Sequence, residues 1–436
     1  MSDLPTSRAG TATDGSALEP TLVLAFCGRG NGGTQRRSIP REGLLLGRGA
    51  AVFDEPFGDQ RMANRHAEIR AERGRVLLRD LGSEVGTRVN GQSILGDRAL
   101  APGDVVRLGD TLFVYSPATP GSEVDEGALV GSSAAMVAVR RSVDAVAKRK
   151  HMVVITGETG TGKEVVGHLI HERSQRTGPF IAVNCGTFTE GLLASDLFGH
   201  VRGAFTGAVS EQQGLFRAAR GGTLMLDEVA EIPLALQATL LRVLEMREVR
   251  PVGGTRDIAT DVRIVTTSNR ELIDLVQSGR FRADLYSRLA QWTIRLPSLR
   301  ERREDIPALA SHLLALCDGP GRKLSSDLGE ALLAHDWPLN VRGLLTVLSV
   351  AVVSSPEDGP LLLTDDVRLA LWTTRSMSAE PEEIEGPPLD KDELTRLMEQ
   401  FHGKVAAAAR HIGVTRPKLY RLLWAQEIDP ALFRAL

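Results

Sequence analysis

The segment Gly157–Lys163 constrains the fold of this chain more than any other part of the sequence. It reads Gly-Glu-Thr-Gly-Thr-Gly-Lys and stands between an apolar run at Val153–Thr156 and a helical pattern that begins at Lys163. A strand, a glycine-rich loop and a helix in this order are the context of a P-loop, whose backbone N–H groups and helix N-terminus face phosphate. The segment predicts a nucleotide-binding α/β domain. The predicted binding residues are Gly157, Glu158, Thr159, Gly160, Thr161, Gly162, Lys163 and Glu164.

In this arrangement Lys163 is expected to reach the β- and γ-phosphates of a bound nucleotide. Glu164 follows it where Ser or Thr is usual, so one hydroxyl on the metal side is absent. The alternative interpretation is a merely glycine-rich turn, which the flanking strand and helix disfavour.

A second acidic element supports the nucleotide site. The apolar run Leu224–Leu226 ends in Asp227 and Glu228. Asp227 is placed to hold Mg²⁺, and Glu228 to orient or deprotonate an attacking water. Alone, such a pair is often two solvated acids at a helix start; downstream of a P-loop, it predicts a Walker B element and therefore ATP and Mg²⁺ as cofactors.

The pattern along the chain predicts a multidomain fold class. Short apolar runs punctuated by Gly, Asp and Asn indicate an all-β sandwich, strands alternating with helices indicate a parallel α/β sheet, and helix-period patterns indicate an all-helical lid and a small all-α segment at the end. The predicted boundaries are a disordered tail at 1–20, the sandwich at 21–116, a linker at 117–126, the α/β subdomain at 127–298, the lid at 299–374, an acidic Pro-rich linker at 375–388 and the terminal segment at 389–436.

Charge is informative only locally. The whole chain has a formal net charge of −3, which excludes a generally basic protein. Residues 400–426, however, contain five cations and no acid: Lys404, Arg410, Arg416, Lys418 and Arg421. Within them, Val405–Ile412 is predicted to form a helix, Gly413–Thr415 a tight turn and Arg416–Leu423 a second helix. This is the order of a helix-turn-helix. The alternative is a basic helical hairpin that serves packing.

Other classes are excluded by what the sequence lacks. No apolar run approaches the roughly 18 residues that span a bilayer, and the N-terminus lacks the pattern of a signal peptide. The three cysteines, Cys27, Cys185 and Cys317, are scattered and form neither a disulfide framework nor a zinc site by themselves. We therefore expect a cytoplasmic protein without membrane partners.

The central region resembles the AAA+ domain of bacterial sigma-54-dependent transcription activators. The resemblance covers most of residues 127–375 and depends on the Walker A element, on Phe198-Gly199-His200, on Gly-Ala-Phe-Thr-Gly-Ala at 203–208 and on Arg-Pro-Val-Gly-Gly at 250–254. It implies that the hexapeptide touches sigma-54 and moves with the nucleotide state. The implied contact residues are Gly203, Ala204, Phe205, Thr206, Gly207 and Ala208. The alternative is an ordinary glycine-rich surface loop.

The same resemblance assigns roles to further residues. It implies that Asn184 restrains the catalytic Glu228, that Asn269 is sensor I, and that Arg342 is sensor II. Arg282 and Arg288 are implied to be arginine fingers that enter the neighbouring subunit's site, which requires an oligomer, usually a hexameric ring. By themselves, two such arginines often lie on a solvated helix face. The sequence departs from the family at Leu339, where glycine is usual, and at Gly343, where glutamate is usual.

The terminal segment resembles the Fis-type DNA-binding domain of these activators, which bind paired half-sites as dimers. The resemblance implies DNA contacts by Thr415, Arg416, Lys418, Tyr420 and Arg421.

The N-terminal sandwich resembles a forkhead-associated (FHA) domain, through Leu46-Gly47-Arg48, Arg65–Ile69, Asp80–Ser83 and Gly86–Gly91. Such domains bind phosphothreonine proteins, and an arginine with neighbouring hydroxyl or amide donors suits a phosphate. The candidate contacts are Arg48, Arg65, Thr87 and Asn90, whereas Ala63, Asn64 and Val85 replace residues usual in the family.

The sequence thus predicts an ATP-hydrolysing activator that binds enhancer DNA and remodels RNA polymerase holoenzyme carrying sigma-54 for open-complex formation. Two alternatives stay open. One is a DNA-binding regulator whose AAA+ domain does not hydrolyse ATP, motivated by Leu339 and Gly343. The other is a phosphoprotein adapter that acts through the FHA domain.

Overall fold

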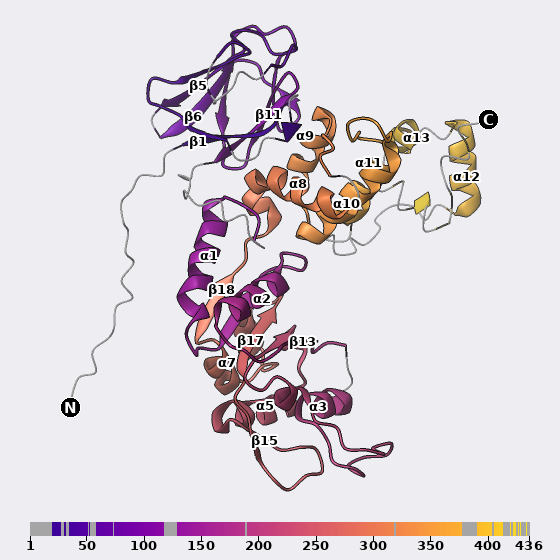
Figure 1. Cartoon of the computed structure of the whole chain (residues 1–436). Coiled ribbons are helices and arrows are strands. Elements are labelled where there is room, and N and C mark those ends of the chain that lie inside the picture. Colours follow the sequence, from indigo (N-terminus) through magenta and orange to yellow (C-terminus); the bar gives the residue numbers. More distant parts are fainter. Residues whose placement is uncertain are drawn as a thin grey trace, which may run out of the picture. The chain divides into compact units, whose positions relative to one another are not determined.

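The structure is a computed structural model, and it divides the chain into two compact units, Met1–Leu371 and Trp372–Leu436. We describe each unit separately (Figure 1). None of the helices it describes is long and apolar enough to cross a membrane. It describes residues 20–27, 30–31, 35–50, 52, 58–72, 74–116, 129–187, 190–317, 320–376, 390–402, 405–412, 419, 422–423, 426, 428 and 433.

The first domain is a β-sandwich of two antiparallel sheets, as predicted. One sheet has the order β2-β1-β11-β10-β7-β8, with β3 paired to β1, and the other has the order β4-β5-β6-β9. The strands are β1 (Thr21–Cys27), β2 (Gly30–Asn31), β3 (Arg36–Ser38), β4 (Leu44–Leu46), β5 (Ala67–Glu72), β6 (Arg75–Asp80), β7 (Thr87–Val89), β8 (Gln92–Ser93), β9 (Asp97–Leu100), β10 (Val105–Leu108) and β11 (Thr111–Ser116).

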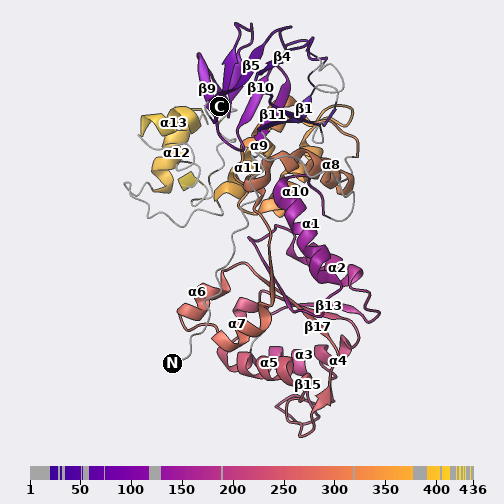
Figure 2. The same ribbon diagram turned by 90° about the vertical axis from the view of Figure 1, so that its left-hand side faces the viewer.

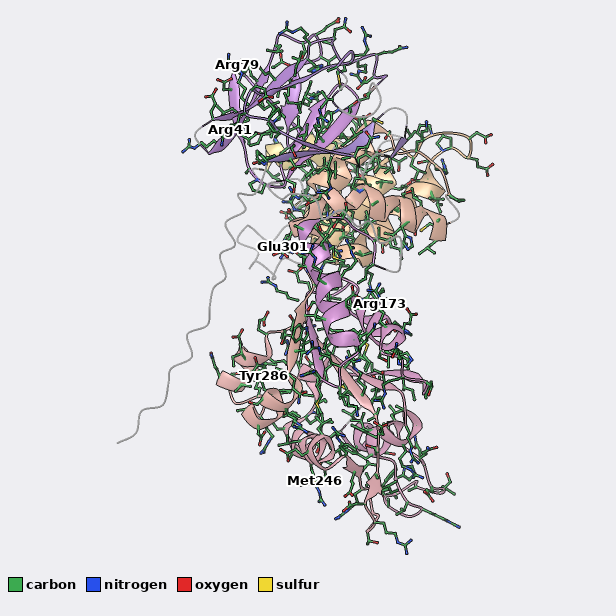
Figure 3. All side chains as sticks on the ribbon, turned by 60° about the vertical axis from the view of Figure 1, so that its left-hand side comes forward. Arg41, Arg79, Arg173, Met246, Tyr286 and Glu301 are labelled. Carbon is green, nitrogen blue, oxygen red and sulfur yellow. The ribbon has the colours of Figure 1, made fainter. Side chains whose placement is uncertain are left out.

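Alternation along the strands accounts for the sandwich core. In β5 and β6, Ile69 and Leu78 face inward and are fully buried, whereas neighbours such as Arg79 face outward and pair with acids such as Asp97 (Figure 3). The inward side chains of both sheets form one aliphatic cluster between them.

The second domain is built on a five-stranded parallel sheet in the order β13-β14-β17-β12-β18. Its strands are β12 (Val153–Thr156), β13 (Phe180–Asn184), β14 (Thr223–Asp227), β17 (Arg263–Ser268) and β18 (Trp292–Arg295), with a separate antiparallel pair β15 (Glu248–Val249) and β16 (Ile258–Ala259). Its helices are α1 (Ala134–Ala147), α2 (Lys163–Arg173), α3 (Glu190–Phe198), α4 (Leu215–Ala218), the 3-10 turn η1 (Val229–Glu231), α5 (Leu234–Met246), α6 (Leu272–Gln277) and α7 (Ala283–Leu289).

Helices cover both faces of this sheet, which is why its strands are apolar on both sides. Val154 and Ile155 are neighbours in β12 and point to opposite faces, so each enters a different core. Helices α1 and α2 cover one face, and α3, α5 and α7 cover the other (Figures 1 and 2). The predicted parallel α/β fold is confirmed.

A helical lid follows the sheet. It comprises the 3-10 segment η2 (Leu299–Asp305), α8 (Ile306–Leu316), α9 (Ser326–Ala334), α10 (Asn340–Ser354) and α11 (Asp365–Ser376). The start of η2 is fixed by a capping box, in which Ser298 caps the first turn and the Glu301 carboxylate accepts the Ser298 backbone N–H. Trp337 is fully buried at its centre, with its indole N–H donated to the Leu332 carbonyl.

The sandwich and the lid share one apolar cluster within the first unit. Phe26 and Leu112 of the sandwich belong to the same buried group as Leu309 and Leu328 of the lid. Beside it, the buried Arg107 donates to Asp327 at 2.8 Å and to Glu330 at 2.6 Å. The pKa of Asp327 lies below its usual value because it accepts this hydrogen bond. The sandwich and the lid, which the sequence predicts as separate domains, therefore pack against each other in one continuous structure.

The second unit contains α12 (Lys391–Gln400) and α13 (Val405–His411). Asp390 and Glu393 form a capping box at the start of α12. Leu394 and Met398 pack with Ala408 in one small core. Helix α13 confirms the first predicted helix of the helix-turn-helix. The predicted turn and the predicted DNA contacts Thr415, Arg416, Lys418, Tyr420 and Arg421 lie outside the described residues.

Candidate nucleotide site

The P-loop connects β12 to α2 at the carboxyl end of the parallel sheet. Gly160 and Gly162 have φ angles of 77° and 103°, which side chains other than glycine rarely adopt. Gly160 also lies under the lid, because a Cβ there would come within 2.2 Å of the Leu339 carbonyl oxygen. The loop thus needs glycine for both its conformation and its contact with the lid.

Lys163 is the cation of this loop. Its Nζ donates to the carbonyl oxygens of Gly157 at 2.8 Å and Glu158 at 3.1 Å. Burial lowers its pKa, while the nearby carboxylates of Asp227 and Glu228 act in the opposite direction. A partly buried ammonium whose hydrogen-bond partners are neutral carbonyls suits an anionic ligand, and this observation fits the phosphates of a nucleotide.

The two Walker B acids stand at the end of β14, beside the P-loop. Asp227 is the last residue of the strand, and Glu228 turns into the left-handed region with a φ of 54°. Thr267 in the adjacent strand β17 fixes both, because its hydroxyl donates to Asp227 Oδ1 and accepts the Glu228 backbone N–H at 3.0 Å. Sequence reasoning missed Thr267. Its only signal is its place at the end of an apolar run, two residues before Asn269.

Asn184 lies on the other side of the same acids. Its amide nitrogen donates to Asp227 Oδ2 at 3.2 Å, and its amide oxygen accepts the Gly186 N–H at 2.8 Å. The expected partner was Glu228, so in this structure Asn184 acts on the neighbouring carboxylate instead. The restraint of Glu228 by Asn184 stays a prediction. Asn269 is exposed directly after β17, at the same edge of the sheet.

The lid contacts the P-loop through Asn340 and Arg342. The Asn340 amide donates to Glu158 Oε2 at 3.2 Å and to the Thr159 carbonyl at 3.0 Å, while its oxygen accepts the Leu299 N–H at 2.7 Å. The exposed Arg342 lies close enough to Lys163 for its positive charge to help lower the pKa of Lys163. This position is compatible with the predicted sensor II role.

Glu158 also pairs with Arg300 of η2, which donates to Glu158 Oε2 at 2.9 Å. This hydrogen bond is the main cause of the lowered pKa of Glu158. The second residue of the P-loop is therefore tied to the lid by a charge pair.

The departures at Leu339 and Gly343 leave the turn before α10 intact. Leu339 has a φ of −96°, which any residue adopts, and the positive φ angles fall on Trp337 and Asn340 at 51° each. Gly343 is buried in the first turns of α10. The missing glycine therefore causes no backbone strain at position 339.

The predicted arginine fingers lie on and before α7. Arg282 is exposed and pairs with Asp284 at 2.7 Å, and this hydrogen bond raises the pKa of Arg282. Arg288 is half-buried and donates to the Leu244 carbonyl at 3.2 Å, leaving its buried Nε without a partner. Both side chains are held within the α5–α7 region of their own chain.

The hexapeptide Gly203–Ala208 forms the tip of an exposed loop between α3 and α4. The loop is closed by the Gly203 N–H, which donates to the Ala208 carbonyl at 2.8 Å, and its base pairs with Val252 and Gln212. Phe205 is 42% exposed and its ring meets His200 edge-on at 5.0 Å. Thr206 is exposed at the tip. An aromatic and a hydroxyl are thus presented outward by a glycine-rich turn.

The four candidate phosphopeptide residues are not brought together equally. Arg48 and Arg65 are exposed, and Arg48 is next to Asn64, whose amide oxygen accepts its Nε–H at 3.4 Å. Thr87 is 1% exposed and its hydroxyl donates to Asp80 at 2.6 Å. Asn90 is tied to Asp104 and to the Val105 N–H. Thr87 and Asn90 serve the sandwich itself, and only the two arginines stay available to an anion.

Comparisons with known proteins agree with this arrangement. Residues 129–295 match the model of the sigma-54 interaction domain, residues 44–109 that of the FHA domain and residues 300–383 that of the AAA+ ATPase lid domain.

The chain is also similar to complete regulatory proteins. It is 41% identical to the transcriptional regulatory protein GlrR of Escherichia coli over 335 residues, which cover 75% of this chain and 74% of GlrR. It is 39% identical to the response regulator PilR of Pseudomonas aeruginosa over 338 residues, covering 74% and 75% of the two chains. Among solved structures, NtrX from Brucella abortus in complex with ATP is 31% identical and superposes with a TM-score of 0.53, over 70% of this chain and 71% of that chain.

Proposed function

The chain belongs to the family of sigma-54-dependent transcriptional regulators, and from this premise we propose that it is an ATP-hydrolysing activator. In this proposal it binds enhancer DNA and remodels RNA polymerase holoenzyme carrying sigma-54 until the promoter opens. The observation that carries the proposal is the joint placement of Lys163, Asp227 and Glu228 at one sheet edge of a domain that also exposes the Gly203–Ala208 tip.

The P-loop and the Walker B acids supply the proposed hydrolysis site. Lys163 and the P-loop amides hold the β- and γ-phosphates, and Asp227 holds Mg²⁺, which would neutralise phosphate charge. Glu228 orients or deprotonates the attacking water. Asn269 senses the γ-phosphate and Arg342 couples the lid. NtrX, the structural relative, carries ATP in its complex, which supports ATP as the nucleotide here.

The fingers imply an assembly. The Arg282 side chain is exposed, and within the described part of the chain it pairs with Asp284 on the protein surface. A surface ion pair of this kind contributes roughly 0–1 kcal/mol, so the arginine can be recruited by a stronger anion. We propose that Arg282 and Arg288 reach the phosphates of a neighbouring subunit in a ring of copies of this chain.

The remaining partners follow from the two ends of the chain. The segment 389–436 is the proposed DNA-binding domain, with Thr415, Arg416, Lys418, Tyr420 and Arg421 as contacts. The FHA domain is the proposed regulatory input, and Arg48 with Arg65 is the proposed anchor for a phosphothreonine protein. All of these partners are found in the cytoplasm, where we place the protein.

An open-complex assay with purified sigma-54 holoenzyme tests the central proposal. We expect Thr206→Ala to lose activation while it retains ATP hydrolysis, because the hydroxyl lies on the exposed tip and away from the nucleotide site. Thr177→Ala, which removes an exposed hydroxyl outside the loop, is the matched control and should activate normally. Full activation by Thr206→Ala would show that the loop has been assigned wrongly.

A further inference from the structure

A cavity of about 270 Å³ lies in the α/β subdomain at the edge opposite to the nucleotide site. Its lining includes Met152, directly before β12, and Arg263, the first residue of β17. The P-loop and Asp227 follow the ends of parallel strands, whereas these residues precede their beginnings. The cavity is therefore separate from the nucleotide site, and none of the roles described above uses it.

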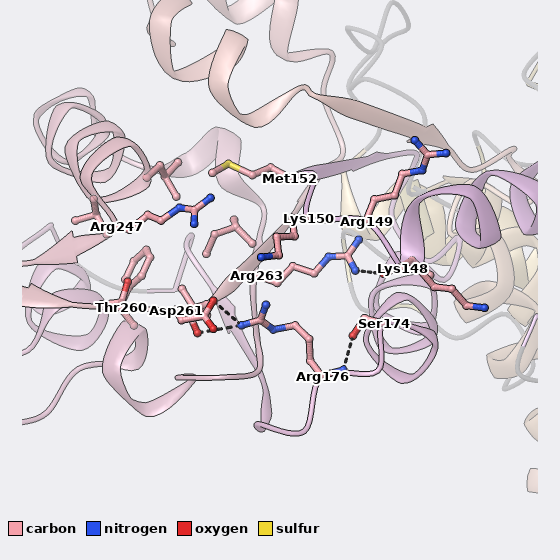
Figure 4. A pocket seen from close by; sticks show the side chains of 16 residues that line it. Lys148, Arg149, Lys150, Met152, Ser174, Arg176, Arg247, Thr260, Asp261 and Arg263 are labelled. Atoms are coloured by element: carbon pink, nitrogen blue, oxygen red, sulfur yellow. Dashed lines mark hydrogen bonds and ion pairs between the residues drawn. The ribbon is translucent and has the colours of Figure 1, made fainter.

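Cations dominate the lining of this cavity. Asp261 is the one carboxylate among the lining residues, which include six cations. Figure 4 shows Arg176 beside Asp261, whereas the side chains of Lys148 and Arg149 extend away from it. The cations are Lys148, Arg149, Lys150, Arg176, Arg247 and Arg263. The rest of the lining includes apolar side chains such as Phe216 and Leu244. Converging positive charge over a partly apolar floor favours an anionic ligand.

Arg263 is the buried cation of this group, with an exposed fraction of 5%. Its two Nη groups donate to the carbonyls of Val146 and Ala147 at the end of α1. Its Nε is buried and has no partner in the structure. Burial and the nearby Arg176 lower its pKa to about 10, so no described carboxylate compensates its charge.

Arg176 lies beside it and carries a second unpartnered donor (Figure 4). Its Nη2 donates to Asp261 Oδ1 at 2.9 Å and to the Asp261 carbonyl at 3.1 Å, while its buried Nε has no partner. Arg176 thus pairs with a largely exposed carboxylate, while the neighbouring Arg263 pairs with no carboxylate among the described residues. An anion in the cavity would balance the positive charge that Asp261 leaves uncompensated.

Helix capping explains only part of this arrangement. Arg263 satisfies two carbonyls at the end of α1, and that role needs neither the free Nε donors nor the cations at the rim. Lys148, Lys150 and Arg247 are exposed and come from two separate segments that converge on the same opening. Lys148 caps the end of α1, where its charge favours the helix dipole, but Arg247 follows α5, so α1 does not account for its place at this opening.

We propose that this cavity binds the phosphate group of a small molecule, either free phosphate or a phosphate monoester. The phosphate accepts hydrogen bonds from Arg176 and Arg263, and Lys150 and Arg247 attract it at the entrance. The volume lies just below the range of about 300–1,000 Å³ usual for larger ligands, so the cavity suits a compact anion.

Isothermal titration calorimetry on the full chain at low ionic strength tests this proposal. The P-loop is first saturated with a non-hydrolysable ATP analogue and Mg²⁺, and the titration is repeated with Lys163→Ala. Inorganic phosphate and ribose 5-phosphate are the probes, and tighter binding of one of them identifies the source. We expect about one anion per chain in both backgrounds.

Substitutions of the exposed residues at the entrance, Lys150 and Arg247, test the cavity without disturbing the buried core. Lys150→Gln and Arg247→Gln should each raise the dissociation constant about two- to fivefold, and the double variant roughly tenfold. Arg37→Gln removes an exposed cation of β3 and should leave binding unchanged. Arg176→Gln should weaken binding by at least about tenfold if it folds.

Two results would overturn the proposal. One is that neither inorganic phosphate nor ribose 5-phosphate gives a binding signal. This holds also if a short DNA duplex, titrated as a third probe, does bind. The other is binding that the rim variants leave unchanged. In either case, the arginines of the cavity serve only to cap α1 and to pair with Asp261.

Discussion

At the scale of single residues, the two acids at the end of β14 depend on a side chain from the neighbouring strand. Thr267 is fully buried and contacts both Asp227 and the backbone of Glu228. Its position follows from the parallel pairing of β14 with β17, in which Leu226 lies opposite Thr266. The two segments are 40 residues apart, so only the strand order reveals this contact.

We expect Thr267→Val to lower the rate of ATP hydrolysis more than nucleotide binding. Valine keeps the shape but removes the hydrogen bonds that orient the two acids. Losing a buried partner of a charged group costs about 1–3 kcal/mol, or roughly ten- to a hundredfold in kcat. Steady-state ATPase assays measure this, with little change expected in KM.

Thr266→Val is the matched control for this prediction. The Thr266 hydroxyl is equally buried but donates to the Val153 carbonyl at 3.3 Å, away from the acids. Its variant should hydrolyse ATP at nearly the normal rate. Equal losses in the two variants would mean that Thr267 acts only through stability.

At the scale of secondary structure elements, the sequence was most informative where the apolar pattern is regular. The apolar run Val153–Thr156, predicted to be a strand, is β12 with these same bounds. The helix predicted to begin at Lys163 is α2, Lys163–Arg173. The contact between the lid and the P-loop could not be predicted in this way, since Asn340 and Glu158 are 182 residues apart.

We expect Asn340→Ala to weaken both ATP binding and the fold of the lid. The change leaves the buried Leu299 N–H without its acceptor and places alanine at a φ of 51°. The unpaired donor costs about 1–3 kcal/mol and the backbone strain about 1–3 kcal/mol more. Urea unfolding measures the loss, and the KM for ATP should rise.

Leu339→Gly tests whether the turn before α10, rather than the Asn340 contacts, limits ATP hydrolysis. The substitution introduces the residue usual in the family, but Leu339 already has an unstrained φ of −96°. We therefore expect no gain in ATPase activity and a stability loss of about 0.5–1 kcal/mol from backbone entropy. A large gain in activity would instead support the hypothesis of a hydrolysis-deficient AAA+ domain.

At the scale of the whole first unit, the FHA sandwich and the lid meet in a buried junction that contains an acid. Glu304 of η2 is 8% exposed and accepts a hydrogen bond from the Ser116 hydroxyl at 3.2 Å. Burial, together with the nearby Asp305, raises the pKa of Glu304, and Arg36 acts against this shift. The junction was not predictable from sequence, because Ser116 and Glu304 are 188 residues apart and neither belongs to a motif that marks it as a contact.

We expect Glu304→Gln to stabilise the unit at neutral pH. A raised carboxyl pKa means that the folded state prefers the protonated form. Its contribution is present below the ordinary pKa of 4.5 and is lost as the pH rises through the raised value. Glutamine keeps an acceptor for Ser116 without the buried charge. Thermal unfolding should show a gain of about 2–4 °C for each kcal/mol at neutral pH.

The gain should disappear in acid, where the wild-type carboxyl is protonated. Glu172→Gln, which neutralises an exposed acid on α2, is the control and should shift the midpoint little at any pH. A gain that did not depend on pH would contradict the role of burial at Glu304.

At the scale of the assembly, the arginine fingers predict that two inactive variants restore each other. Glu228→Gln lacks the carboxylate proposed to activate water but keeps both fingers, and Arg282→Ala keeps that carboxylate but lacks one of the two fingers. Loss of a finger alone is expected to cost about 10³-fold or more. In a mixed ring, some nucleotide sites combine Glu228 of an Arg282→Ala subunit with Arg282 of a neighbouring Glu228→Gln subunit. ATPase activity should therefore reappear on mixing.

A mixture of Glu228→Gln with Lys163→Ala distinguishes trans action from simple assembly. Both variants lack part of the same site, so no interface in their mixture is complete and no activity should return. The specific activity of the wild type should also rise cooperatively with protein concentration as rings form. A constant specific activity, together with no recovery in the first mixture, would place Arg282 outside the catalytic machinery and restore its interpretation as a solvated partner of Asp284.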